Sequence, residues 1–371
     1  MHISKLAALA GIAGVAGLTA TAAMQQMHEH PTEADPGLEV DYTGSEVIVT
    51  MAPVHLPRME PGADHHGDHG AVFPPVESFA MPVHGYLRGF DYEVVDGAGN
   101  ELPREIVHHF NVIDPVHREL FLPISQRLLA AGQETGAQNM PRVLFGVPVY
   151  LGQEFVVAAM LHNPTGDEHH DVRLRVKLKY VKVGRPWPLF EVYPFQLDVA
   201  FPAGDKSFDL PPGVSQKAWE GSPSREGRIM VIGSHLHDLA THITFDDVTE
   251  GKTLWTGYPV TDETGRIEGV TIGHVYRTLG LKITPDHRYR ITVHYDNPSP
   301  DSLPSGGMGV VAGVFMPSGG GMWPRADTTS ELYALDRQHY LREVRGRYDV
   351  IASSDSMVGA NTEAVGHVHD E

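Results

Sequence analysis

Residues 172–180 alternate strictly between apolar and basic side chains. The apolar members are separated by Arg173, Arg175, Lys177 and Lys179, and are Val172, Leu174, Val176, Leu178 and Tyr180. Because side chains of a strand point to opposite faces with a period of two, this segment predicts a strand with one buried and one wet face. Residues 289–295 alternate in the same way, and apolar, β-rich runs occupy 143–161, 229–232 and 310–316.

Turn-forming residues interrupt these runs at short intervals. Gly, Pro, Asp and Asn cluster at 163–168 and 296–307, and strands do not alternate regularly with helices. Many short strands separated by such turns are typical of all-β sandwiches. The only helices that we expect lie near 118–131 and 329–345.

The length of the chain, 371 residues, predicts more than one hydrophobic core. Two prolines at 184–188 follow the long alternating strand, so we place a boundary there. We therefore predict an all-β protein with two jelly-roll-like β-sandwich domains packed side by side, at 41–184 and 185–325. A polar tail at 24–40 and a C-terminal helix with a flexible tail at 326–371 flank them, and 58–75 reads as a polar loop.

The first 23 residues resemble a secretory signal peptide. A short basic start precedes an apolar run from Leu6 to Leu18 and a small-residue stretch ending at Ala23. The run is shorter than the roughly 20 residues of a spanning helix, so we expect a periplasmic or secreted protein without stable membrane insertion. The absence of cysteine means that no disulfide supports the fold, and the formal charge of -19 argues against a nucleic-acid partner.

Histidines are the candidate functional residues, but the chain has 23 of them. Composition alone predicts about 1.4 adjacent pairs and about as many His-x-His triplets, so neither motif is specific. Most pairs and triplets fall in polar tails and turns, including His65-His66 and His169-His170. One pair and one triplet lie in β-type sequence, and these are the informative ones.

The two histidines of the triplet, His235 and His237, would point to the same face of a strand, where both can bind one ion. The pair His108 and His109 would point to opposite faces unless the backbone is bulged between them. His162 ends an apolar strand at a turn, and Met308 follows a Gly-rich turn. Each of these residues alone is also compatible with an ordinary structural role. His242 could extend the triplet, although its spacing from His237 suits no simple strand geometry.

In order along the chain, these residues resemble the copper type II, ascorbate-dependent monooxygenases, the family of peptidylglycine α-hydroxylating monooxygenase and dopamine β-monooxygenase. The similarity rests on four short signals and covers roughly residues 80–320. They are His108-His109-Phe110, Leu161-His162-Asn163, His235-Leu236-His237 and the Met308 of residues 304–311.

The resemblance implies two β-sandwiches and two copper ions per chain. His108, His109 and His162 would hold an electron-supplying copper, whereas His235, His237 and Met308 would hold the copper at which O₂ is activated and a C–H bond is hydroxylated. A thioether favours Cu(I) and imidazole suits either oxidation state, so these ligand types fit that chemistry. Ascorbate or another one-electron reductant would be the co-substrate.

Three positions depart from the amidating enzymes of this family. The arginine, asparagine and tyrosine with which those enzymes grip a substrate carboxylate are replaced here by Gly233, Val310 and Ala312. Because burying an unpaired carboxylate is costly, we expect a small, neutral or hydrophobic substrate. Two alternatives remain: a non-catalytic periplasmic copper-binding or storage protein on the same fold, and a structural β-sandwich interaction domain with incidental histidines.

Overall fold

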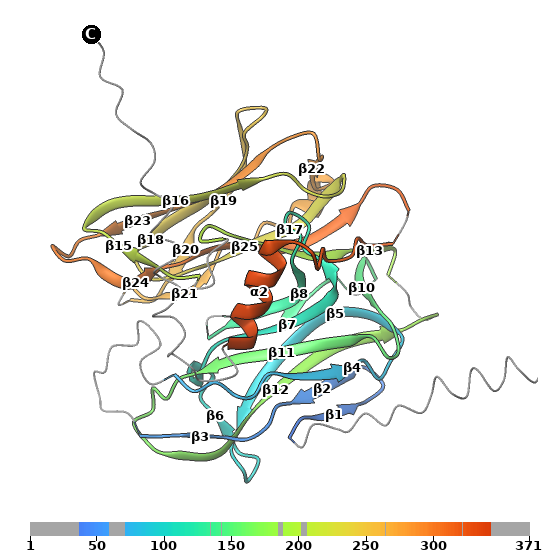
Figure 1. The fold of residues 1–371 in the computed structure, drawn as a ribbon, viewed down its shortest axis with the longest axis vertical. Helices are drawn as coiled ribbons and strands as arrows, with labels where there is room; N and C mark the ends of the chain where they lie inside the picture. The colour runs from blue at the N-terminus through green and yellow to red at the C-terminus, as the bar shows by residue number, and fades with distance from the viewer. Residues whose placement is uncertain are drawn as a thin grey trace, which may run out of the picture. The chain divides into compact units, whose positions relative to one another are not determined.

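The computed structural model describes residues 37–58, 71–133, 135–141, 143–184, 188–201, 206–263, 265–320 and 322–342. The predicted signal peptide, residues 24–36 of the predicted tail, most of the 58–75 loop and the chain beyond 342 lie outside these residues. Strands dominate the described part (Figure 1), which confirms the all-β prediction. No helix in the described ranges has the length and apolarity to cross a bilayer.

The first sandwich pairs a nine-stranded sheet with a four-stranded sheet. The larger sheet consists of β1 (Glu39–Tyr42), β2 (Glu46–Thr50), β12 (His169–Lys182), β5 (Gly85–Val95), β10 (Phe145–Val149) and β13 (Phe190–Glu191), with β3 (Val54–Leu56), β6 (Glu101–Leu102) and β9 (Gln138–Asn139) at its margins. The smaller sheet runs β4 (Glu77–Ala80), β11 (Glu154–Leu161), β7 (Val107–Arg118) and β8 (Ser125–Gly132). Residues of both sheets share one apolar core, to which Val176, Val112 and Phe155 belong.

The alternating segment forms β12, as its pattern predicts. Its apolar side chains from Val172 to Tyr180 are at most 1% exposed, and the basic side chains between them are partly exposed. β1 begins at Glu39, so the last two residues assigned to the polar tail belong to a strand instead.

The second sandwich is built from two four-stranded sheets. One contains β14 (Tyr193–Asp198), β25 (Gly309–Pro317), β17 (Gly227–Leu236) and β22 (Leu281–Ile283); the other contains β16 (Gly213–Gly221), β23 (Tyr289–Asn297), β18 (Ala240–Asp247) and β19 (Lys252–Gly257). Two small pairs accompany them, β15 (Phe208–Leu210) with β24 (Leu303–Gly307) and β20 (Pro259–Thr261) with β21 (Ile267–Val270). Phe195, Phe245 and Ile291 are among the core residues that join the two larger sheets.

The helix predicted over 118–131 is wrong, whereas the one near 329–345 is confirmed as α2 (Glu331–Arg342). Residues 125–132 form β8 even though Gln, Arg, Leu and Ala favour helices. Pro123 opposes a helix through this segment, and the loop from Leu120 to Ile124 packs into the core of the second sandwich. Burial on both faces of β8 therefore overrides its local propensity.

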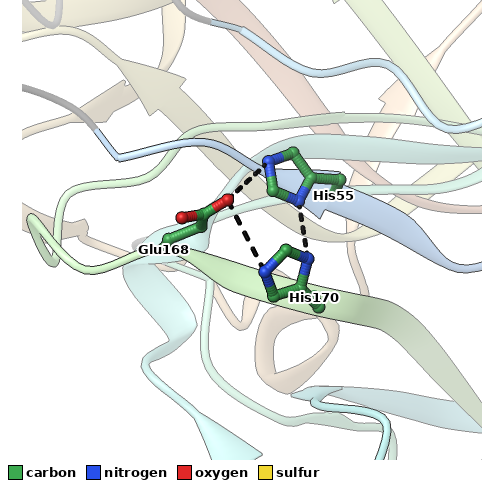
Figure 2. Close-up of side chains that lie close together, drawn as sticks. All are labelled: His55, Glu168 and His170. Atoms are coloured by element: carbon green, nitrogen blue, oxygen red, sulfur yellow. Dashed lines mark hydrogen bonds and ion pairs between the residues drawn. The ribbon is translucent and has the colours of Figure 1, made fainter.

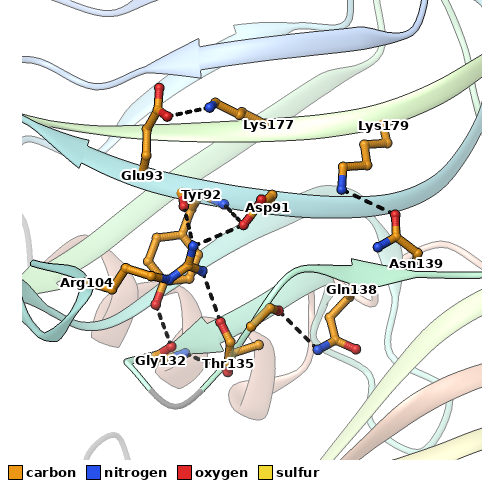
Figure 3. A network of polar contacts seen from close by, with 11 residues as sticks. Asp91, Tyr92, Glu93, Arg104, Gly132, Thr135, Gln138, Asn139, Lys177 and Lys179 are labelled. Carbon is orange, nitrogen blue, oxygen red and sulfur yellow. Dashed lines mark hydrogen bonds and ion pairs between the residues drawn. The ribbon is translucent and has the colours of Figure 1, made fainter. Parts of the chain in front are cut away.

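A polar network fixes the backbone just before β7, the strand that carries two of the candidate ligands (Figure 3). Arg104, in the short 3₁₀ turn η1 (Arg104–Ile106), donates to Asp91 Oδ1 at 3.1 Å and to the carbonyls of Tyr92 and Thr135 at 2.8 and 3.2 Å. Its guanidinium carbon lies 3.9 Å from the centroid of the Tyr92 ring, and the Tyr92 hydroxyl donates to Gly132 O at 2.9 Å. The entry into β7 is thus held by β5 and by the end of β8.

Glu119, directly after β7, links β8 to β14. One carboxylate oxygen accepts the backbone N–H of Arg127 at 2.7 Å, and the other accepts that of Gln196 at 3.1 Å. The side chain is 1% exposed. Burial raises the pKa of Glu119 to about 7, against the opposing effect of the two N–H donors and of Arg127.

The raised pKa of Glu119 predicts that the free energy of unfolding decreases as the pH rises through the range between about 4.5 and 7. A carboxyl whose pKa rises on folding binds more protons in the folded state, so its stabilising contribution is full below about pH 4.5 and declines as the pH rises to about 7. We expect Glu119→Gln to flatten this part of the profile of unfolding free energy against pH, measured by urea unfolding at pH 5 and 7.5. The exposed Glu268→Gln is the control and should keep the wild-type slope. An unchanged slope in Glu119→Gln would refute the assignment.

Candidate functional site

The first histidine group depends on an irregularity in β7. Met160 of β11 pairs with His109, but Leu161 pairs with Val107, so His108 is an extra residue in the ladder. Such a β-bulge changes the direction of the side chains around it. Adjacent residues of a regular strand point to opposite faces, so a bulge of this kind is needed if His108 and His109 are to bind one ion. The ring centroids of His108 and His109 lie 5.0 Å apart.

His162 completes this group from the end of β11. Its ring stacks on that of His108, with centroids 4.6 Å apart and planes inclined by 28°. The side chain is 7% exposed, and its backbone N–H donates to Ile106 O at 2.8 Å. The rings of His109 and His162 therefore both lie beside that of His108, although the three residues do not offer one nitrogen each within 4.8 Å of one another.

The second group lies at the end of β17. His235 and His237 are separated by 5.4 Å between ring centroids, with the planes inclined by 86°. Met308 lies between β24 and β25, and β25 pairs with β17 such that Gly309 is opposite Leu236. His242, by contrast, stacks on His294 of β23 at a centroid distance of 4.1 Å.

A tyrosine that sequence reasoning missed connects His237 with Met308. The hydroxyl of Tyr295, on β23, accepts the N–H of Met308 at 2.9 Å and that of His237 at 3.4 Å. It also donates a short hydrogen bond to Met308 O. The side chain has no exposed surface, and its burial raises the pKa of the phenol to about 12. In the sequence, Tyr295 is one of the apolar-face residues of an alternating strand. That alternation does not indicate what its hydroxyl contacts.

The two groups adjoin one another through His108 and His237, whose ring centroids are 6.4 Å apart. Burial, followed by the neighbouring His109, His162, His237 and His235, lowers the pKa of His108 to about 2. His108 is therefore neutral at ordinary pH, which is the protonation state that binds metal. The five imidazoles therefore form one continuous set of potential ligands, and the backbone of Met308 adjoins this set through Tyr295.

The three substituted positions beside His235 carry no charged side chain. Val310 is the cross-strand partner of His235, and Ala312 is that of Gly233. Cross-strand partners share a face of the sheet, so the three substituted positions lie beside His235. A methyl group added to Gly233 would meet only Ile272, at 3.8 Å. A longer side chain would therefore fit at this position, which glycine occupies.

Asp198 is an acidic residue on the same face, and the sequence analysis did not identify it. It pairs with Val310 from β14 and is 3% exposed. Burial raises the pKa of its carboxyl, while Lys206 and the N–H of Ala200 oppose that shift. Val310 thus lies between this carboxyl and His235 in one row of the sheet.

The residue types in the two groups are ones that copper accepts as ligands. Imidazoles and one thioether are the ligands that copper accepts in both of its common oxidation states, and no carboxylate or thiolate belongs to either group. The groups come from strands and strand ends of two sandwiches, and hydrogen bonds to Tyr295 fix the backbone of His237 and Met308. His108, His109 and His162 would be the ligands of one ion and His235, His237 and Met308 those of another, and the three imidazoles of the first group would have to turn to bring their nitrogens within reach of one ion.

Comparisons with known proteins give no family assignment. No family model matches the chain, and no curated protein matches it. Among solved structures, a recombinant N-glycanase F (PNGase F) is 9% identical with a TM-score of 0.36, covering 72% of this chain and 96% of its own. PNGase F, described as a glycosylasparaginase from Flavobacterium meningosepticum, is 9% identical with a TM-score of 0.37 over 73% of this chain and 96% of its own. Similarities this low carry no argument about activity.

Proposed function

We propose that this protein is an exported copper-dependent monooxygenase that hydroxylates a C–H bond of a small, neutral or hydrophobic substrate. The reductant is an external one-electron donor such as ascorbate. In the overall reaction R–H and O₂ give R–OH and water, with two electrons from the reductant and two protons from solvent. The observation that carries the proposal is the bulge at His108, where the rings of His109 and the more distant His162 adjoin that of His108, which in turn adjoins His237.

When bound, copper supplies one-electron redox chemistry and the activation of O₂. The protein's own residues would hold and orient it. Stacking of His162 on His108 fixes the first group, and Tyr295 fixes the backbone of the second. The apolar Val310 and Ala312 beside His235 offer a substrate van der Waals contact, and no cationic side chain occupies the position of Gly233.

A pair of test substrates separates this proposal from the alternatives. Copper-loaded protein with ascorbate should consume O₂ and hydroxylate ethylbenzene, whereas 4-ethylbenzoate, which differs by one carboxylate, should react far less because nothing pairs that charge. We expect two coppers per chain. Copper binding with O₂ uptake that yields no hydroxylated product from either compound would favour a copper-storage protein instead.

Met308→Ala tests the roles of the two groups. We expect the variant to keep one copper, to lose the other and to show no ethylbenzene-dependent O₂ uptake, since it lacks the thioether of the second group. Metal analysis and an oxygen electrode measure both effects. Met322, which is 88% exposed, provides the control, and Met322→Ala should match the wild type. Zinc in place of copper, or full activity in Met308→Ala, would refute the proposal.

A further inference from the structure

A second cluster of metal-binding side chains lies elsewhere in the first sandwich (Figure 2). His55 belongs to β3, His170 to β12, and Glu168 immediately precedes β12. The Glu168 Oε1 atom lies 3.2 Å from His55 Nε2 and 3.5 Å from His170 Nε2. One potential ligand atom from each residue can be chosen so that all three lie within 4.8 Å of one another.

The backbone is distorted at this cluster. His169 pairs with Leu56 and Val172 pairs with Val54, so two residues of β12, His170 and Asp171, oppose the single His55. Asp171 has a φ of 53°, in the left-handed region that residues other than glycine seldom adopt. A regular ladder would direct neighbouring side chains to alternate faces. The bulge and the left-handed residue instead direct His170 toward His55.

A buried asparagine holds the turn that carries Glu168. Asn163 is 2% exposed and its amide donates to Pro57 O at 2.7 Å and to Asp167 O at 2.5 Å. Its carbonyl oxygen accepts the hydroxyl of Thr165 at 2.8 Å. These bonds connect the chain after β3 to the turn before β12, so the elements bearing the three side chains are held together by contacts outside the cluster.

The two spacings from the carboxylate fit a tetrahedral ion. Metal–nitrogen and metal–oxygen bonds of about 2.0–2.1 Å at tetrahedral angles place neighbouring ligands about 3.3 Å apart. The two distances from Glu168 Oε1, 3.2 and 3.5 Å, bracket that value. All three residues are exposed, which leaves the remaining position open to water.

The two rings also contact each other. Both Nε2 atoms face the carboxylate, and one Nδ1 atom donates a hydrogen bond to the other at 3.0 Å. Neutral imidazoles that bind an ion through Nε2 both carry a proton on Nδ1, so the two Nδ1 atoms must separate when the ion binds. Two imidazoles and one carboxylate oxygen are a ligand set used by divalent first-row metals. Neighbouring His169 is held differently, because its Nε2 contacts the Thr165 hydroxyl at 2.7 Å.

We propose that His55, Glu168 and His170 form a binding site for a divalent metal ion, Zn²⁺ in particular, separate from the two histidine groups described above. The ion connects β3 to the start of β12. The role of the ion is structural, since it connects a marginal strand to the main sheet. The site does not depend on the proposed oxygenase activity.

Zinc stoichiometry of the full chain tests the proposal. The many other histidines also bind zinc, so the informative quantity is the difference between variants in equilibrium dialysis. We expect His170→Ala and Glu168→Gln each to bind one Zn²⁺ fewer per chain than the wild type. His84→Ala, which removes another exposed histidine, should bind as many as the wild type. Equal zinc binding by wild type, His170→Ala and Glu168→Gln would overturn the proposal.

Two further measurements keep the test independent of folding defects. Glu168→Gln preserves the size of the side chain, and its circular dichroism should match that of the wild type. Co²⁺ bound tetrahedrally by nitrogen and oxygen gives an intense visible absorption, which Glu168→Gln and His170→Ala should reduce and His84→Ala should leave intact. The same absorption in all four proteins would count against the site.

Discussion

Asp336→Ala is expected to lower the free energy of unfolding by about 3–5 kcal/mol. The carboxylate of Asp336, on α2, accepts hydrogen bonds from both terminal nitrogens of Arg127, at 2.6 and 2.7 Å. Arg127 is 8% exposed and Asp336 3%. Removing the acid leaves a buried guanidinium that still donates to Ser125 O, at 2.9 Å, and has only the Glu119 carboxyl, whose pKa burial raises to about 7, to balance its charge. The cost comes from that poorly compensated charge.

Urea unfolding followed by tryptophan fluorescence measures the effect, because buried Trp323 lies close in sequence to α2. The matched control is Glu331→Ala, which removes an exposed acid from the same helix and should cost less than about 1 kcal/mol. Asp336→Asn should fall between the two, since it retains one acceptor but no charge. Similar stability of Asp336→Ala and Glu331→Ala would show that the buried pair does not stabilise the fold.

Tyr295→Phe is expected to weaken copper binding by the second group by about 10–100-fold, as is common when a residue supporting metal ligands is removed. The hydroxyl is the shared partner of His237 N, Met308 N and Met308 O. Without it, the two residues lose the atom that holds their backbones together. The first group, on β7 and β11, should retain its affinity.

Copper titration followed by electron paramagnetic resonance distinguishes the two groups. Tyr289→Phe is a matched control on the same strand: that hydroxyl is also buried and accepts one N–H, from Thr284 at 3.0 Å. It should lower stability to a similar degree while leaving copper binding unchanged. If both variants lost copper equally, Tyr295 would have only a structural role.

The fold was predictable wherever one face of a strand is buried and the other is wet. The alternation of 172–180 identified β12, because each apolar residue there enters one core. The same reasoning failed for β8, which is buried on both faces and has a helix-favouring composition. Only the packing of its surroundings explains why it is a strand, and no local pattern reports that packing.

Only part of the candidate site could be read from spacing. Their positions two residues apart place His235 and His237 on one face of a strand, and adjacency means that His108 and His109 need a bulge to share a site. His162 and Met308 were singled out by the family resemblance alone. Tyr295 could not be identified, since its role depends on the pairing of β17 with β25, which brings residues 237 and 308 to one hydroxyl. The cluster of His55 with His170 was equally inaccessible, because a bulge 115 residues away in sequence creates it.

The extra residue at His108 makes the length of β7 itself a determinant of the site. Deleting His108 would leave a regular ladder with β11, because Val107, His109 and Phe110 already pair with three successive residues of that strand. Val107, Phe110 and Val112 would then alternate onto the core side without any change of face. The core therefore does not need the extra residue, and its presence in β7 serves the histidine pair alone.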